Sequence, residues 1–296
     1  MHRRHFPSLS ILGLLLALAV QCGTPSSSNA EASWDIWPDV LYVPTPPEVV
    51  EEMLRLADVG PGDVVYDLGS GDGRIVISAA RDRGARGVGV DIDPQLIRLS
   101  ERNAQREGVA DRVRFVEEDL FRIDFSEAGV VTLYLLPDLN LRLRPELFRQ
   151  LRPGTRVVSH AFHMEDWRPD EEARVGRHDI FFWVIPANVS GRWSWQMPEQ
   201  FEDEGVELEL EQTFQQVSGF LRSANGVHGL SWAALRGDRL MLVFDEGVGA
   251  DAKPVIFEGR LDGEQIRGSF VREGGEPQPW RAVREAGSLR PLETGW

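Results

Sequence analysis

The chain is poor in two residue types, and each shortage limits what it can do. Its 296 residues contain a single cysteine, Cys22, which excludes an intramolecular disulfide. Lys253 is the only lysine, so nearly all positive charge is arginine, and 32 basic residues face 47 acidic ones to give a net charge of -15. An acidic surface repels phosphate backbones, which argues against a nucleic-acid partner and suits a basic acceptor better, such as a lysine or arginine side chain.

The sequence also lacks an apolar run long enough to cross a bilayer. The run from Leu9 to Val20 has about twelve residues, the length of a signal-peptide core, and it follows the basic residues 1–5. Two processing points are visible: Cys22, a lipidation candidate although Gln21 is not the small residue expected before it, and the A-x-A site Ala30-Glu31-Ala32. Residues 1–32 are therefore predicted to be a signal peptide and tether. We expect an exported chain, periplasmic or membrane-anchored through Cys22, and a cytoplasmic one if the signal is not used.

Beyond the tether, apolar periodicity predicts alternating strands and helices joined by short loops. This alternation is typical of a doubly wound parallel sheet with a Rossmann-like α/β fold. Two consecutive strands without a helix between them are expected to end the domain, which we place at residues 33–187. Helices are predicted at 48–56, 73–81, 94–105 and 141–151, and strands at 63–68, 87–90, 113–117, 129–136, 155–162, 171–175 and 179–185. The helix at 94–105 is expected to start with Asp93 as its N-cap and Pro94 at its first position.

After residue 187 the pattern changes to short alternating runs separated by turn signals such as Asn225-Gly226 and Asp262-Gly263. About eight strands at a spacing of ~10 residues predict an all-β meander, closed or nearly closed as an up-and-down barrel, over residues 188–285, with a tail at 286–296. Large aromatics are expected to fill this barrel, although they could instead line a small-molecule pocket. They are Trp193, Trp195, Trp232 and Trp280.

A glycine-rich loop follows the first predicted strand. Gly69-Ser70-Gly71-Asp72-Gly73 leads directly into a helix, so its backbone amides and the helix N-terminus can contact a ligand. A dinucleotide site prefers G-x-G-x-x-G and an apolar residue two positions before the first glycine. That position is Asp67 here, whose carboxylate would repel a diphosphate but attract the ammonium of an amino acid.

Two further acids follow the next two strands. Asp91 ends the second strand and can accept both hydroxyls of a ribose, and Asp119 follows the third and can accept from an adenine amino group. Ligands of open α/β sheets bind at this carboxyl edge of the strands. Ammonium, ribose and adenine together match S-adenosylmethionine (SAM), which we favour over NAD. The predicted cofactor contacts are Asp67, Gly69, Ser70, Gly71, Gly73, Asp91, Ile92, Asp119 and Leu120.

Residues 42–170 resemble class I SAM-dependent methyltransferases, whose motif is an apolar strand followed by D/E-x-G-x-G-x-G. Within that superfamily, residues 42–46 (Y-V-P-T-P) and 67–77 (D-L-G-S-G-D-G-R-I-V-I) are similar to the protein-lysine methyltransferases of the ATP synthase c subunit and the adenine nucleotide carrier. The resemblance implies that Tyr42 and Thr45 fold over the amino-acid end of the cofactor, close to its methyl group. It need not extend to the target, because those enzymes lack the β-domain and this chain carries an export signal.

The methyl acceptor is expected beside the fourth strand, where residues 134–140 follow it. Tyr134 or Asp138 could orient an ammonium and help to remove its proton, or Asp138 and Asn140 could simply cap the next helix. His160 and His163 lie three residues apart on an extended segment, which points them to opposite faces and disfavours a shared metal. No metal site is predicted. One of the two histidines could face the acceptor pocket, although a structural role is favoured.

The sequence thus predicts a SAM-dependent methyltransferase acting on an amine, with a protein lysine favoured. Two alternatives stay open. One is a small-molecule methyltransferase that uses the barrel as a lid. The other is a non-catalytic exported ligand-binding protein, suggested because SAM is made in the cytoplasm. The oligomeric state is not indicated.

Overall fold

The structure is a computed structural model, and it describes residues 42–196, 206–223, 226–246 and 252–292. The predicted signal peptide, tether and lipidation site at Cys22 lie outside these residues. Within the described ranges, no helix combines the length and the apolar character that crossing a membrane requires.

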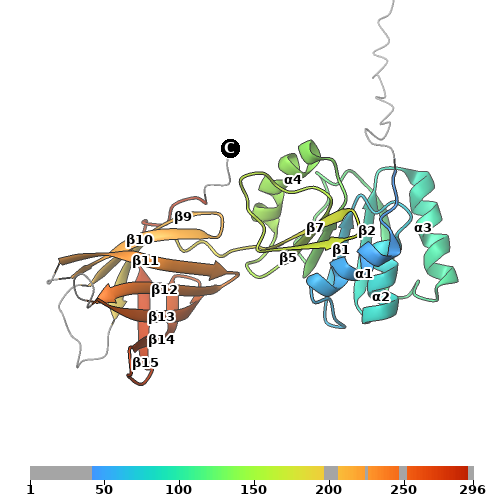
Figure 1. Cartoon of the computed structure of the whole chain (residues 1–296). Coiled ribbons are helices and arrows are strands. Elements are labelled where there is room, and N and C mark those ends of the chain that lie inside the picture. Colours follow the sequence, from blue (N-terminus) through green and yellow to red (C-terminus); the bar gives the residue numbers. More distant parts are fainter. Residues whose placement is uncertain (1–41, 197–205, 224–225, 247–251, 293–296) are drawn as a thin grey trace, which may run out of the picture. The chain divides into compact units, whose positions relative to one another are not determined.

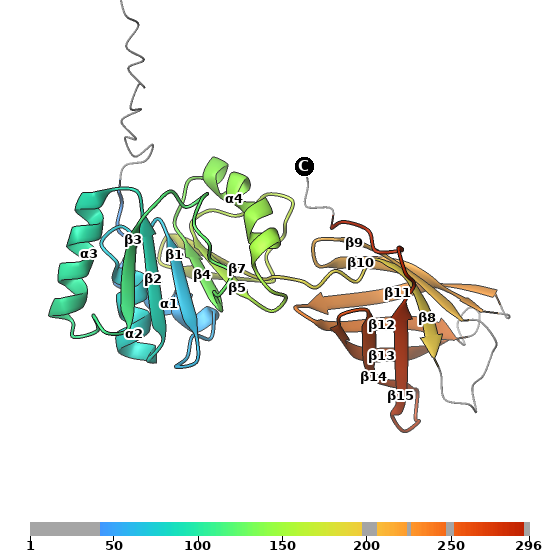
Figure 2. The same cartoon turned by 180° about the vertical axis from the view of Figure 1, so that it is seen from behind.

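The first part of the chain is a seven-stranded sheet with the order β3-β2-β1-β4-β5-β7-β6 (Figures 1 and 2). The first five strands run parallel, whereas β7 is antiparallel to β5 and β6 to β7. This confirms the doubly wound sheet and its end of two consecutive strands. The strands are β1 (Val64–Leu68), β2 (Arg86–Asp91), β3 (Val113–Glu117), β4 (Val130–Leu133), β5 (Arg156–His160), β6 (Glu171–Val175) and β7 (His178–Val184).

Helices cover both faces of the sheet, and the central strands are buried on both sides. Successive side chains of a strand point to opposite faces, so Val65 joins one core cluster while Tyr66 and Leu68 join the other. The first cluster contains the apolar residues of α1 (Pro47–Leu56) and α2 (Arg74–Arg83), and the second contains those of α4 (Pro137–Gln150). Asp67 has the same parity as Val65, so it points toward the side of α1 and α2.

Two helix starts illustrate how local sequence signals act. Asp93 caps α3 (Pro94–Arg106) by accepting a hydrogen bond from the Gln95 amide at 2.7 Å, with Pro94 at the first helical position, as predicted. Helix α4 begins at Pro137 and not at Leu141 as expected, because a proline at the first position starts a helix readily. Asp138 and Asn140 therefore lie inside α4, and the alternative that they cap it is wrong.

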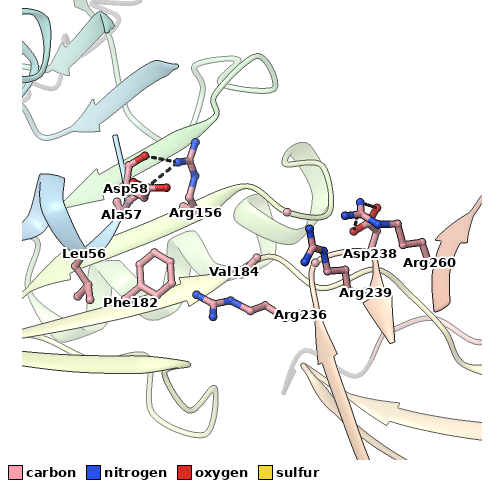
Figure 3. A pocket seen from close by; sticks show the side chains of 12 residues that line it. Leu56, Ala57, Asp58, Arg156, Phe182, Val184, Arg236, Asp238, Arg239 and Arg260 are labelled. Atoms are coloured by element: carbon pink, nitrogen blue, oxygen red, sulfur yellow. Dashed lines mark hydrogen bonds and ion pairs between the residues drawn. The ribbon is translucent and has the colours of Figure 1, made fainter. Parts of the chain in front are cut away.

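An arginine on β5 fixes the end of α1 to the sheet. Arg156 donates two hydrogen bonds of 2.9 Å, to the carbonyls of Ala57 and Asp58 (Figure 3). It also pairs with Asp63. These carbonyls follow the last turn of α1, where backbone oxygens lack partners within the helix. The contact thereby fixes α1, the helix that directly follows the segment 42–46.

The second part of the chain is a closed barrel of antiparallel strands in the order β10-β11-β12-β13-β14-β15-β8-β9, which confirms the predicted β-domain type. Aromatic rings fill the interior: Trp195 stacks on Trp280 with centroids 4.8 Å apart, and Phe257 meets Trp195 edge-on at 4.5 Å. The expectation was wrong for Trp232, which is 53% exposed. The strands are β8 (Gly191–Gln196), β9 (Glu207–Thr213), β10 (Gln216–Ser223), β11 (Gly226–Arg236), β12 (Arg239–Glu246), β13 (Lys253–Asp262), β14 (Gln265–Arg272) and β15 (Gln278–Arg284).

Candidate functional site

The glycine loop between β1 and α2 has the left-handed backbone that its sequence suggested. Gly71 and Gly73 have φ angles of 55° and 79°. A Cβ on Gly71 would lie 2.1 Å from Cε2 of Tyr42, and one on Gly73 would lie 2.6 Å from Cε1 of Phe115. Only glycine can occupy these positions, because it adopts a positive φ readily and has no Cβ to clash with such close neighbours. The loop is thus packed between the Tyr42 ring and β3.

Asp67, at the end of β1, is a buried carboxyl with little to stabilise its charge. It is 2% exposed, and the hydroxyl of Thr132 on β4 donates to its Oδ1 at 2.7 Å. Burial raises the pKa of Asp67 to about 7, and the Thr132 hydrogen bond opposes that rise only in part. A cation bound beside Asp67 would restore its charge, which is the property expected of a site for an ammonium group.

The two other predicted acids lie at the same edge of the sheet. Asp91, at the end of β2, accepts hydrogen bonds from the amides of Gly71 at 2.8 Å and Asp93 at 3.0 Å, so it ties the glycine loop to the neighbouring strand. Burial raises the pKa of Asp91 as well. Asp119, after β3, accepts from the Phe121 amide through Oδ1 at 2.9 Å. Because β3, β2 and β1 are adjacent, the three carboxyls follow one another along the carboxyl edge.

Ser70 adds a second indication of a ligand. Its hydroxyl oxygen is buried, with no hydrogen-bond partner among the described residues. Buried polar atoms are normally paired, so an orphan in a glycine loop marks a place for a bound group. Together with Asp67, it shows that the residues present fit the amino-acid end of SAM. Ile92 and Leu120, the predicted neighbours of the adenosine, are both partly buried next to Asp91 and Asp119.

The segment before α1 is held to this loop by Arg74, through contacts that the sequence did not reveal. Arg74 binds Asp72 through two nitrogens, at 2.9 and 2.7 Å, and donates from its third to the Thr45 carbonyl at 2.8 Å. Burial, with Asp72 adding to it, raises the pKa of Tyr42 to about 12. The residues D-G-R at 72–74 were the only hint of the Asp72–Arg74 pair in the sequence. Tyr42 and Thr45 therefore lie against the glycine loop.

On the other side of Asp67 the ends of β4 and β5 carry the predicted acceptor residues. Tyr134 is half-buried, and its ring centroid lies 3.9 Å from that of His160, which is fully buried at the end of β5. Asp138 lies exposed on the first turn of α4. The structure brings Tyr134 and His160 together but places no described contact between either of them and Asp138.

His163 has no part in this cluster. It is exposed, and its Nδ1 accepts a hydrogen bond from the Glu165 amide at 3.0 Å. The chain turns after His160, where Ala161 has a φ of 68°, so the two histidines separate. Among the described residues, no group of three or more histidine, cysteine, aspartate or glutamate side chains is arranged to hold a metal ion.

Comparison with known proteins places this geometry among methyltransferases. The model of the ANTKMT methyltransferase domain matches residues 67–171. A protein-lysine N-methyltransferase from Saccharolobus islandicus is 46% identical over 153 residues, which are 50% of this chain and 95% of that protein. A human lysine N-methyltransferase of the ATP synthase c subunit is 36% identical over 148 residues, or 50% of this chain and 62% of the relative.

Among solved structures, one described as an RNA methyltransferase from Salinibacter ruber, in complex with S-adenosyl-L-homocysteine, is 54% identical. It covers 54% of this chain and 99% of its own, with a TM-score of 0.49. A SAM-dependent methyltransferase from Geobacter sulfurreducens with the same ligand is 30% identical, with a TM-score of 0.37, and covers 40% of this chain and 50% of its own.

Proposed function

This chain belongs to the family of SAM-dependent protein-lysine N-methyltransferases, and from that premise we propose that it transfers a methyl group to the Nζ of lysine side chains in a protein acceptor. The observation that carries the proposal is the match to the Saccharolobus enzyme. It extends over nearly all of that protein and over half of this chain.

We propose that the carboxyl edge of β1 to β3 holds the cofactor. Asp67 would accept from the ammonium group and Asp91 from the ribose hydroxyls, while Asp119 would accept from the adenine amino group. When bound, SAM supplies a methyl group on a positively charged sulfur. The chain's own contribution is to orient this group and exclude water. The remaining contacts would come from Tyr42, Thr45, Gly69, Ser70, Gly71, Gly73, Ile92 and Leu120.

The acceptor amine would then enter beside β4 and β5, where Tyr134 lies and Asp138 is exposed at the rim. Methyl transfer is an in-line displacement, so the amine must be held about 3 Å from the methyl carbon with its lone pair free. An aromatic face such as Tyr134 can hold a cationic side chain, and Asp138 can attract it. The net charge of -15 favours a basic acceptor in the same way.

We expect the full-length chain, given SAM labelled on the methyl group and envelope extract, to label protein bands whose hydrolysate contains N-methyl-lysine. The assay has a low background, because Lys253 is the only lysine on which the enzyme could label itself through a side chain. Asp67→Asn serves as the inactive control, and Asp262→Asn, at an exposed turn of the barrel, as the matched active one. Label confined to small molecules or to RNA, or no label at all, would contradict the proposal.

We also propose that the chain is exported, with residues 1–32 as its signal and tether, 33–187 as its catalytic domain and 188–285 as its barrel domain. If Cys22 is lipidated, the protein should be recovered with membranes on fractionation. Cys22→Ser should release it into the soluble envelope fraction, because a lipid chain contributes about 0.8 kcal/mol per buried methylene to membrane binding. Recovery of both forms in the cytoplasmic fraction would show that the signal is not used.

A further inference from the structure

A chain of hydrogen-bonding side chains leads from the acceptor side of the site toward the surface. Thr45 Oγ1 lies 3.2 Å from Nδ1 of His160, and His160 Nε2 lies 2.9 Å from Nδ1 of His178. Thr45 is 3% exposed and His160 is fully buried, whereas His178, the first residue of β7, is partly exposed. The three residues come from distant parts of the sequence, and the fold brings them into one line.

We infer from the elements around Thr45 that the inner end of this chain lies on the acceptor side of the site. Arg74, at the start of α2, holds the Thr45 carbonyl, and α2 begins directly after the glycine loop. His160 ends β5, which pairs with β4, and β4 carries both Thr132, the partner of Asp67, and the Tyr134 segment. The ends of β1, β2 and β3 bear the cofactor acids, so the ends of β4 and β5 are left for the acceptor.

We propose that Thr45, His160 and His178 form a relay that carries the proton of the acceptor ammonium out of the site. This inference rests on amine methylation as the proposed function. A lysine amine has a pKa near 10.4, so at neutral pH it reaches the site protonated and must lose a proton before its lone pair can attack. Neither histidine contacts the reacting atoms; both act through Thr45.

Each step of the relay moves one proton and leaves no charge behind. The ammonium gives a proton to Thr45 Oγ1 as the hydroxyl proton passes to Nδ1 of His160. The proton on Nε2 of His160 passes to Nδ1 of His178, and the one on Nε2 of His178 passes to water. The freed lone pair then forms the C–N bond as the C–S bond breaks, which leaves a neutral thioether and moves the positive charge to the methylated nitrogen. The relay, rather than the distances, requires His160 to carry its resting proton on Nε2 and His178 to carry its own on Nε2.

The surroundings of His160 keep it from storing the proton. Burial, with the nearby His178 adding to it, lowers the pKa of His160 to about 4. The titratable side chains in contact with it are Tyr134 from the end of β4 and His178 from β7, and the segment before α1 contributes only the hydroxyl of Thr45. Beside His178 on β7, Asp179 is paired with Arg174 at 3.2 Å, and the Arg74 guanidinium donates to the Thr45 carbonyl at 2.8 Å. A neutral imidazole in this setting passes protons on without becoming charged.

The test uses His178→Asn in the full-length chain. Asparagine keeps a polar atom near the position of Nδ1 but cannot pass a proton onward. At pH 7 we expect methyl incorporation into envelope extract to fall about tenfold, and the deficit to close toward pH 10, where the amine arrives deprotonated. Imidazole added to His178→Ala should restore part of the rate. His163→Gln, at an exposed histidine outside the cluster, should match the wild type at every pH.

A purely structural role for His178 would lower the rate by the same factor at every pH and would not respond to imidazole. Either result, or a variant that equals the wild type, overturns the relay. An independent measurement uses the NMR shifts of the imidazole ¹⁵N atoms in the SAM-free protein. They should show that His160 carries its proton on Nε2 and stays neutral down to pH 5. A proton on Nδ1 of His160 would overturn the relay. If the wild type itself methylates no amine, the proposed function fails first, and the ring shifts still report on the hydrogen-bonded chain.

Discussion

Replacing Asp67 by asparagine is expected to weaken SAM binding about 100-fold while making the SAM-free protein more stable. The carboxylate is the proposed partner of the cofactor's ammonium, and a hydrogen bond between charged groups contributes roughly 1.5–3 kcal/mol. Asparagine keeps the shape and can still accept from Thr132, but it carries no charge. Calorimetric titration with SAM and S-adenosylhomocysteine measures the loss. Asp170→Asn is the matched control, since burial also raises the pKa of Asp170, which accepts instead from the Val184 amide.

The gain in stability follows from the raised pKa. In the unfolded chain Asp67 ionises near pH 4, whereas in the folded protein it keeps its proton up to about 7. The folded state therefore binds more protons between these values, and the wild type loses stability as the pH rises from 4 to 7. Asp67→Asn removes this loss, which is on the order of 2–4 kcal/mol above pH 7 and vanishes near pH 4.

Denaturant unfolding at pH 5 and pH 8 checks this difference, and the same variant tests the ligand. Wild-type affinity for SAM should fall as the pH drops below 7, because the bound ammonium requires the ionised carboxylate, whereas the affinity of Asp67→Asn should stay constant. A variant that binds SAM as tightly as the wild type, or that is less stable at pH 8, would contradict the assigned role of Asp67.

Substituting Gly73 by alanine is expected to destabilise the protein by about 2–4 kcal/mol and to abolish cofactor binding. The new Cβ would lie 2.6 Å from the Phe115 ring on β3 and 2.8 Å from Ser100 Cβ on α3, and both neighbours belong to packed elements that cannot yield. The positive φ of 79° adds strain. Relief requires the start of α2 to move away from β3, which displaces the amides of the loop. Denaturant midpoints and SAM titration measure the two effects.

Gly108→Ala separates crowding from backbone strain. Gly108 has a φ of 69°, but a Cβ there would meet nothing within 4 Å. Its substitution should cost about 1 kcal/mol, the effect of the backbone alone. The excess cost at Gly73 then measures the close packing of the loop. Equal costs at the two positions would mean that the loop adjusts freely and that its glycines serve only the turn.

Much of the fold could be predicted because its signals are local. Apolar periodicity and turn residues predicted the strands of both parts, and the capping residue Asp93 with Pro94 marked the start of α3 correctly. The start of α4 was misplaced, because the apolar pattern weakens before Leu141 whereas Pro137 alone suffices to begin a helix. Trp232 was placed inside the barrel by its size, but a register irregularity between Leu230 and Trp232 in β11 interrupts the alternation.

The cofactor side of the site was likewise accessible to sequence reasoning. Asp67, Asp91 and Asp119 each end or follow a predicted strand, and parallel strands bring their ends to one edge whatever the details of packing. What the sequence alone determined about this protein is therefore the sheet, the barrel and the position of the three acids proposed to bind SAM, since each depends on spacing along the chain.

Only the tertiary structure decided how the acceptor side of the site is built. Residues 45, 160 and 178 have no common spacing, and they meet because β5 pairs with β7 and because Arg74 holds the Thr45 segment against the loop. The protonation of Asp67 and His160 was equally hidden, because a pKa depends on burial and on neighbours distant in sequence. Local chemistry thus identified the cofactor, whereas the proposed route for the proton arises from contacts that exist only once the chain has folded.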